Sequence, residues 1–217
     1  MKGQKAKGEK MKTKIILTSI SALMMSVAGA RAMDLRPFVG ITLGISDINY
    51  SSEMDTSARI SAIDLPTDFF AFGIEGGFRF GEYNKIYNGG MSLNFDMTDA
   101  QKITDVFTNQ KYGELKTFAM SATYDNYIRI SGDKTSRIDL VLGAGLGTMN
   151  YNIDYEPVIG ASDDTIWSTM FAFKAGLDFG LTQNVILSAT ARTFIPTRSH
   201  YAVDAQYVFG GAIRYQF

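Results

Sequence analysis

The sequence has no cysteine, one histidine and four prolines among its 217 residues. Without cysteine there is no disulfide framework and no thiol chemistry. A single histidine, His200, leaves little scope for catalysis that relies on an imidazole base. Beyond residue 32 there is no run of 18 apolar residues, which is what a membrane-spanning helix requires. Stability must therefore come from packing and from backbone hydrogen bonding.

The first 32 residues have the pattern of a secretory signal peptide. Six lysines precede an apolar stretch over 15–27, and Ala30-Arg31-Ala32 fits a cleavage site. We therefore expect residues 1–32 to be removed and 33–217 to form one mature domain. Removal of seven of the 21 basic and one of the 22 acidic residues leaves 14 and 21, a net charge of −7. An acidic mature chain argues against nucleic acid as a partner.

Apolar and polar residues alternate with a period of two through almost the whole mature part, which predicts β-strands. Val39, Ile41 and Leu43, for example, alternate with Gly40 and Thr42. Eight segments show this pattern: 35–46, 69–80, 87–97, 117–125, 137–147, 167–179, 185–192 and 206–217. Strands of about ten residues suit a tilted crossing of a membrane.

The connections between these segments alternate in length. Tight connections are predicted at 81–85, 131–135 and 181–184, and longer ones at 47–67, 98–116, 150–165 and 196–203. Short turns at one end and long loops at the other are typical of outer-membrane barrels, in which the turns are periplasmic. A membrane protein without spanning helices has to be a closed barrel. The predicted fold is therefore all-β, an eight-stranded antiparallel up-and-down transmembrane β-barrel.

The composition of the two strand faces distinguishes a membrane barrel from a soluble one. One face carries Leu, Ile, Val, Phe and Ala, and the other is rich in Gly, Ser, Thr and Asn with isolated charges. Small residues suit the narrow interior of eight strands, so we expect the apolar face to point outward. Aromatic residues gather near both strand ends, Tyr87 and Phe217 at one and Trp167 and Tyr207 at the other, as in interfacial girdles.

Three motifs resemble the family of small outer-membrane barrels that includes OmpA, OmpX and opacity-type proteins. They are the opening 36–40 (RPFVG), the run 143–147 (GAGLG) and the ending 214–217 (RYQF). The resemblance covers the whole mature chain. It implies surroundings of outer-membrane lipid and lipopolysaccharide, and it implies that Tyr215 and Phe217 form a signal for the barrel-assembly machinery.

Charged residues of both signs fall on the inward face. Because an unpaired charge inside a narrow barrel is costly, we expect an ionic network. Its predicted members near the turn end are Arg79, Asp125, Arg137, Asp139, Asp178 and Arg214. A second group at mid-depth is predicted to contain Glu75, Lys174 and Arg192. The network would fill and fix the interior, or, as the OmpA resemblance suggests, act as a gate for ions or small solutes.

These observations favour a non-enzymatic outer-membrane protein with an envelope-structural role and surface-exposed, adhesive loops that bind a ligand outside the cell. The alternatives are a narrow channel gated by interior salt bridges and a lipid-modifying barrel enzyme. The enzyme is disfavoured because Ser199 and His200, as neighbours on an extended segment, point to opposite sides. No cofactor and no metal is expected.

Overall fold

The computed structural model describes residues 35–52, 63–81, 85–132, 136–155, 164–197 and 203–217. The predicted signal peptide lies outside the described residues. The strands are β1 (Leu35–Tyr50), β2 (Ile63–Asp64), β3 (Asp68–Phe80), β4 (Tyr87–Thr98), β5 (Gln101–Asp105), β6 (Lys111–Gly132), β7 (Arg137–Tyr155), β8 (Asp164–Gly180), β9 (Val185–Pro196) and β10 (Val203–Gln216).

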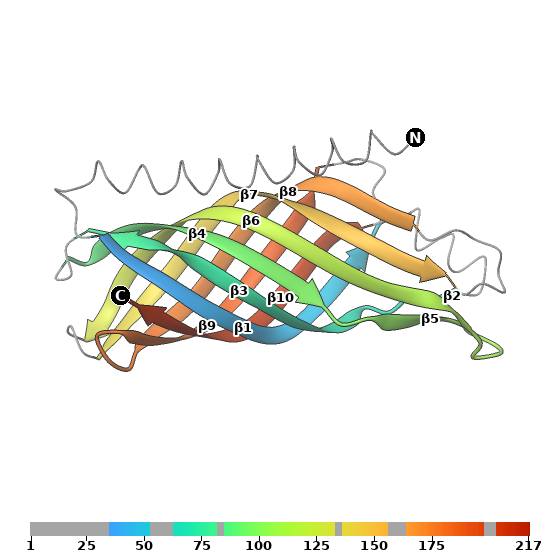
Figure 1. Ribbon diagram of the computed structural model, residues 1–217, viewed down its shortest axis with the longest axis horizontal. Coiled ribbons are helices and arrows are strands. Elements are labelled where there is room, and N and C mark those ends of the chain that lie inside the picture. Colours follow the sequence, from blue (N-terminus) through green and yellow to red (C-terminus); the bar gives the residue numbers. More distant parts are fainter. Residues whose placement is uncertain (1–34, 53–62, 82–84, 133–135, 156–163, 198–202) are drawn as a thin grey trace, which may run out of the picture. The chain divides into compact units, whose positions relative to one another are not determined.

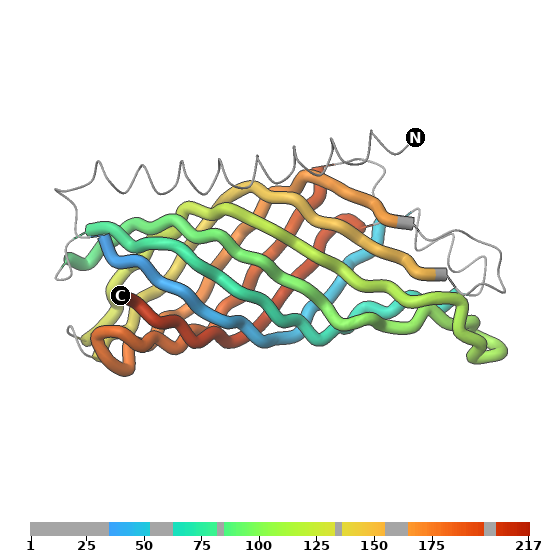
Figure 2. The backbone as a smooth tube through the Cα atoms, in the orientation of Figure 1, coloured from blue at the N-terminus to red at the C-terminus, as the bar shows by residue number. Residues whose placement is uncertain are grey.

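Eight of these strands form a closed ring (Figure 1). Its order is β1, β3, β4, β6, β7, β8, β9 and β10, and β10 returns to pair antiparallel with β1. Figure 2 shows the N-terminal and C-terminal strands side by side at this closure. The predicted eight-stranded barrel is confirmed. We call the end with the connections at 81–86, 133–136 and 181–184 the turn end, and the opposite end the loop end.

The period-two pattern places apolar side chains outside the ring. On β1, Val39, Ile41, Leu43 and Ile45 are all more than half exposed, whereas Thr42 and Ser46 are buried. This order is the reverse of a water-soluble barrel, and it suits a ring whose outer face meets hydrocarbon. None of the described residues belongs to a helix long and apolar enough to cross a membrane.

Aromatic side chains mark both ends of the outer face. At the turn end the rings of Tyr215 and Phe217 meet edge to face, with centroids 5.1 Å apart. At the loop end Phe118 and Trp167 make a similar contact at 6.4 Å. Their separation along the strands fits the two interfacial girdles of a membrane barrel.

The interior is narrow enough to require glycine where strands approach closely. A Cβ on Gly145, which faces inward from β7, would lie 1.9 Å from the carbonyl oxygen of Ala122 on β6. By contrast, a Cβ on Gly76, which faces outward from β3, would have no heavy atom nearer than 3.7 Å. Only the inward glycine is therefore required by packing.

At the loop end the structure differs from the sequence-based prediction. The segment 98–116 was expected to be a loop, but it contains β5 and the first residues of β6, which form a hairpin. The strands continue past the predicted ends, so that β6 has 22 residues and β7 has 19. This hairpin projects past the end of β4 (Figure 1). Pro196, predicted in a loop, is the last residue of β9.

Candidate functional site

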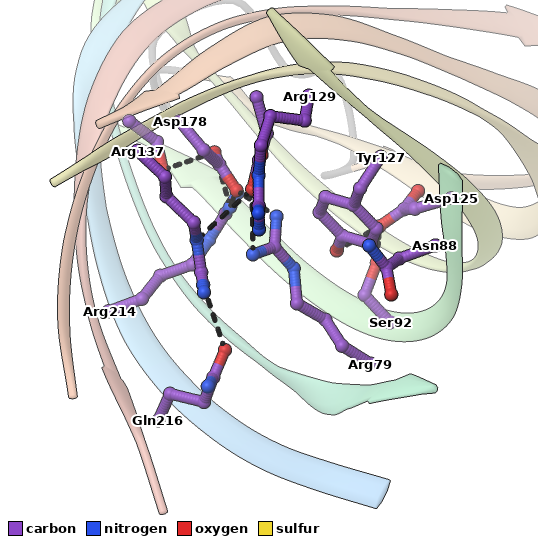
Figure 3. Close-up of polar contacts among 12 residues, drawn as sticks. Arg79, Asn88, Ser92, Asp125, Tyr127, Arg129, Arg137, Asp178, Arg214 and Gln216 are labelled. Carbon is purple, nitrogen blue, oxygen red and sulfur yellow. Dashed lines mark hydrogen bonds and ion pairs between the residues drawn. The ribbon is translucent and has the colours of Figure 1, made fainter. Parts of the chain in front are cut away.

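The turn-end half of the barrel interior is filled by charged side chains from most of the eight strands. All are buried or nearly so, and Figure 3 shows several of them converging across the lumen. The carboxylates are Glu75, Asp96, Asp125, Asp139 and Asp178, and the cations are Arg79, Arg129, Arg137, Lys174, Arg192 and Arg214. We refer to these eleven residues as the ionic network.

Asp178 on β8 has no exposed side-chain surface, which is also true of Asp125. Arg79 donates to it across the lumen at 2.9 Å, and Arg214 on β10 donates at 2.7 Å. The hydroxyl of Ser188 donates a third hydrogen bond at 2.7 Å. Two cations and a hydroxyl thus compensate the cost of burying one charge.

Arg214 also connects this group to the middle of the barrel, because its Nε donates to Glu75 on β3. The second oxygen of Glu75 lies 3.4 Å from the ammonium of Lys174, which is 3.3 Å from Asp125. The hydroxyl groups of Ser92 and Thr123 donate to Asp125 as well. Glu75 is therefore held between two cations that come from different strands.

At the turn end itself, Asp139 on β7 lies at the centre of an arginine cluster. Arg79 and Arg137 approach it at 3.2 and 3.1 Å, and Arg129 at 3.6 Å. The guanidinium of Arg79 also stacks 3.5 Å from the ring centroid of Tyr127, a cation–π contact. Figure 3 shows the side chains of Arg79, Arg129 and Arg137 pointing toward one another in this part of the lumen.

The structure brings the nine residues predicted for an interior network into the lumen, but it groups three of them differently. Asp125, predicted with the turn-end group, lies 3.3 Å from the ammonium of Lys174. Arg214 was predicted with the turn-end group, but it bridges that group and Glu75. Arg192 was predicted to lie with Glu75, but its guanidinium binds Asp96 at 2.7 Å. Arg129 was missed because the predicted strand ended at residue 125, whereas β6 and its inward alternation continue through Tyr127 to Arg129.

The loop-end half of the lumen has the opposite character. Most of its inward side chains are apolar and form a buried cluster, here called the apolar cluster, beside a few buried polar groups such as Gln206, whose amide donates to Ser46 and Thr117. The members include Ile48, Phe69, Ile103, Leu115, Met149, Tyr151, Ile153, Met170, Phe194 and Val203. The inner face was predicted to be rich in Gly, Ser, Thr and Asn with isolated charges, and the apolar cluster was not predicted.

One gap within the apolar cluster is very small. The gap among Tyr50, Leu65, Ile103, Leu115 and their neighbours is about 10 Å³, which holds at most one water molecule. Water and ions gain no polar partners from such a lining. Among the described residues, the ionic network thus occupies the lumen toward the turn end and the apolar cluster occupies it toward the loop end.

The β5–β6 hairpin ends in a tightly bonded turn. One carboxylate oxygen of Asp105 accepts hydrogen bonds from the backbone N–H groups of Phe107 and Thr108, at 2.8 and 2.6 Å. The bond from Thr108, above all, lowers the pKa of Asp105. Asn109 has a positive φ of 59°, which asparagine tolerates well. The turn presents Val106 and Phe107, which are 61 % and 85 % exposed.

On the outer face of the hairpin sheet the side chains are charged. Lys116 lies 2.9 Å from Asp154, and Lys111 lies 2.9 Å from Glu114. The hydrogen bond from Lys116 lowers the pKa of Asp154. Among the described residues no group of three or more histidine, aspartate or glutamate side chains is arranged to hold a metal ion.

A closed antiparallel ring with an apolar outer face and aromatic girdles defines an outer-membrane β-barrel. A model of the family described as "Outer membrane protein beta-barrel domain" matches residues 18–217. The chain belongs to this family and is a protein of the outer membrane.

The chain is similar to several solved structures at low sequence identity. Neisserial surface protein A has a TM-score of 0.50 and 14 % identity, with 84 % of this chain and 97 % of that protein covered. Ail, the attachment invasion locus protein of Yersinia pestis, has a TM-score of 0.47 and 18 % identity, and the match covers 83 % of this chain and 98 % of Ail. The outer membrane protein OprG from Pseudomonas aeruginosa has a TM-score of 0.48 and 12 % identity, and the match covers 82 % of this chain and 95 % of OprG. No curated protein sequence matches.

Proposed function

We propose that the protein is a non-enzymatic scaffold of the outer membrane that presents its loop end to binding partners outside the cell. The observation that carries this proposal is the contrast between the two parts of the barrel. The lumen is filled by the ionic network and the apolar cluster, whereas the β5–β6 hairpin extends outward with an exposed apolar tip. Loops on a rigid scaffold commonly carry binding function.

Adherence of cells that display the protein tests this role. Replacement of residues 101–111 by a two-residue turn should remove most of the adherence to cultured animal cells, at equal surface amounts of protein. The matched control is Leu181→Ser, which changes an exposed residue in a tight connection at the turn end. Equal adherence of the shortened variant and the wild type would refute the role of the hairpin.

A narrow channel is the second candidate, and the position of Glu75 favours it. A carboxylate held by both Arg214 and Lys174 can exchange one partner for the other, which is what a salt-bridge gate requires. Ions would still have to cross the apolar cluster. We therefore expect no conductance in planar bilayers from the wild type or from Glu75→Ala, and stepwise conductance in either protein would support the channel.

The non-enzymatic part of the proposal has its own test. Ser199 and His200, the residues considered for a lipid-modifying site, lie outside the described residues. The mass spectrum of lipid A should be identical in cells with and without the gene. A change in the number of acyl chains would identify an enzyme instead.

For the last strand we propose a role in assembly. The backbone N–H of Phe217 donates to the carbonyl of Pro37 at 2.9 Å, so the C-terminal residue takes part in closing the ring. Its side chain stays 68 % exposed beside Tyr215 and is accessible to the barrel-assembly machinery. Phe217→Ser should reduce the outer-membrane amount several-fold, whereas Phe209→Ser in the middle of the strand should reduce it less. Cleavage of 1–32 is checked by the N-terminal sequence of the mature protein.

A further inference from the structure

The tip of the β5–β6 hairpin carries the most exposed large apolar side chain of the described residues. Phe107 is 85 % exposed, and its neighbour Val106 is 61 % exposed. Both lie in the turn between two strands that continue beyond the barrel, not on the lipid-facing wall (Figure 1). Exposed aromatic residues on a rigid support are a common feature of binding surfaces.

Most backbone N–H groups of this tip donate to partners within the turn. The N–H groups of Phe107 and Thr108 donate to the Asp105 side chain, and that of Gln110 donates to the Thr108 hydroxyl at 3.3 Å. The N–H of Asn109 donates to the Asp105 carbonyl at 3.0 Å, and the Asp105 N–H donates to the Gln110 carbonyl at 2.9 Å. Because these N–H groups are bonded internally, their transfer into a lipid interface costs less free energy.

The tip also lacks free charge. Residues 106–110 are Val, Phe, Thr, Asn and Gln. The adjoining Asp105 carboxylate is occupied by turn hydrogen bonds and by the hydroxyl of Tyr112, and the adjoining Lys111 is paired with Glu114. Contact with a bilayer would therefore not strip water from an unpaired charge, which is the main cost of burying a polar segment.

The surroundings of the tip indicate which kind of bilayer it fits. Negative charge predominates on the loop end of the described residues. Its acids are Asp47, Asp64, Asp68, Asp99, Asp105, Glu114, Asp154 and Asp204, and its lysines are Lys102, Lys111 and Lys116. An anionic membrane would be repelled by this surface, whereas a zwitterionic one would not.

We propose that the hairpin tip is a membrane-contact site that inserts Val106 and Phe107 into the interface of an apposed zwitterionic bilayer. The site gives the outer-membrane protein a lipid partner on a neighbouring cell. This inference rests on the proposed function of the loop end and names its partner. Several copies on one cell would act together, so that weak single contacts add to a strong attachment.

The test measures binding of phosphatidylcholine vesicles by the full chain held in lipid nanodiscs. Val106→Ser with Phe107→Ser should lower the affinity at least tenfold, because each apolar side chain contributes about a factor of ten when it is buried. The control is Ile130→Ser, which changes a residue of similar exposure, 60 %, at the turn end. Vesicles containing phosphatidylserine should bind more weakly at low salt.

A second measurement locates the tip. Phe107→Trp in a Trp167→Phe background should be quenched by brominated phosphatidylcholine in the added vesicles. Quenching by brominated lipid placed only in the nanodisc would overturn the proposal, since the tip would then lie in its own membrane. Equal vesicle binding by the double serine variant and the wild type would overturn it as well.

The outcome also separates this inference from the function on which it rests. If cells adhere through the hairpin but phosphatidylcholine vesicles do not bind, the partner is a protein or a glycan. The loop end then keeps its proposed function and the lipid site is refuted. If neither cells nor vesicles bind, both proposals fail.

Discussion

Neutralising Asp178 should destabilise the barrel more than any single change at an exposed ion pair. Asparagine keeps the size of the side chain, but Arg79 and Arg214 each lose a charged partner in a site with no exposed surface. Removal of one member of a buried ion pair typically costs about 3–5 kcal/mol. Each arginine retains another carboxylate, Asp139 or Glu75, so we expect a value near the lower end of this range.

The assay is urea unfolding of protein folded in lipid vesicles, followed by the mobility shift between folded and heat-denatured protein on gels. Lys116→Gln is the matched control, because its pair with Asp154 is about half exposed and should contribute less than about 1 kcal/mol. The double variant Arg79→Gln with Asp178→Asn should lose less than the sum of the two single changes. A cost for Asp178→Asn no larger than that of the control would refute the reasoning.

Three further predictions follow from the packing and the turn. Gly145→Ala places a methyl group against the backbone of β6 and should cost about 1–3 kcal/mol, whereas Gly76→Ala, with open space around it, should unfold in urea like the wild type. Leu115→Ala should cost about 2–5 kcal/mol in the same assay, and a wild-type urea midpoint would show that the apolar cluster is loosely packed. Asp105 has a lowered pKa, so its contribution to the turn is complete above the pKa of an unstructured aspartate and is lost as the pH falls through the lowered value. The chemical shifts of the backbone amides of the turn, followed as the pH is lowered, should change with a midpoint below the usual aspartate pKa of about 3.9. A midpoint at or above that value would contradict the hydrogen bonds to the Asp105 carboxylate.

Much of the barrel could be predicted because alternation is a local property of the sequence. Ile41 and Thr42 point to opposite sides in any strand, and the polar composition of one face identifies it as the inside. The same alternation placed Glu75, Arg79 and Asp178 in the lumen. Their burial therefore follows from sequence pattern without any knowledge of register.

The pairing of these charges could not be predicted in the same way. Arg192 on β9 meets Asp96 on β4 across the lumen, and this depends on the tilt and stagger of the whole ring. Arg129 on β6 lies opposite Asp139 on β7, and this depends on the register between the two strands. Such contacts are set by long-range geometry.

The loop end was the least predictable part. The segment 101–105 is too short for its alternation to stand out, and its partner strand begins only at Lys111. The apolar cluster had a signal that was not used, since the alternation of β1 continues past Ser46 to the inward Ile48. Continuing the pattern beyond the predicted strand ends would have indicated an apolar interior there.

The central claim is that binding function lies at the loop end and that the filled lumen is structural. Adherence of cells displaying three proteins at equal surface amounts tests it most directly: the wild type, the variant with 101–111 replaced by a short turn, and Glu75→Ala. The account predicts that the hairpin variant loses adherence and that Glu75→Ala retains it. Full adherence of the hairpin variant together with loss in Glu75→Ala would contradict it.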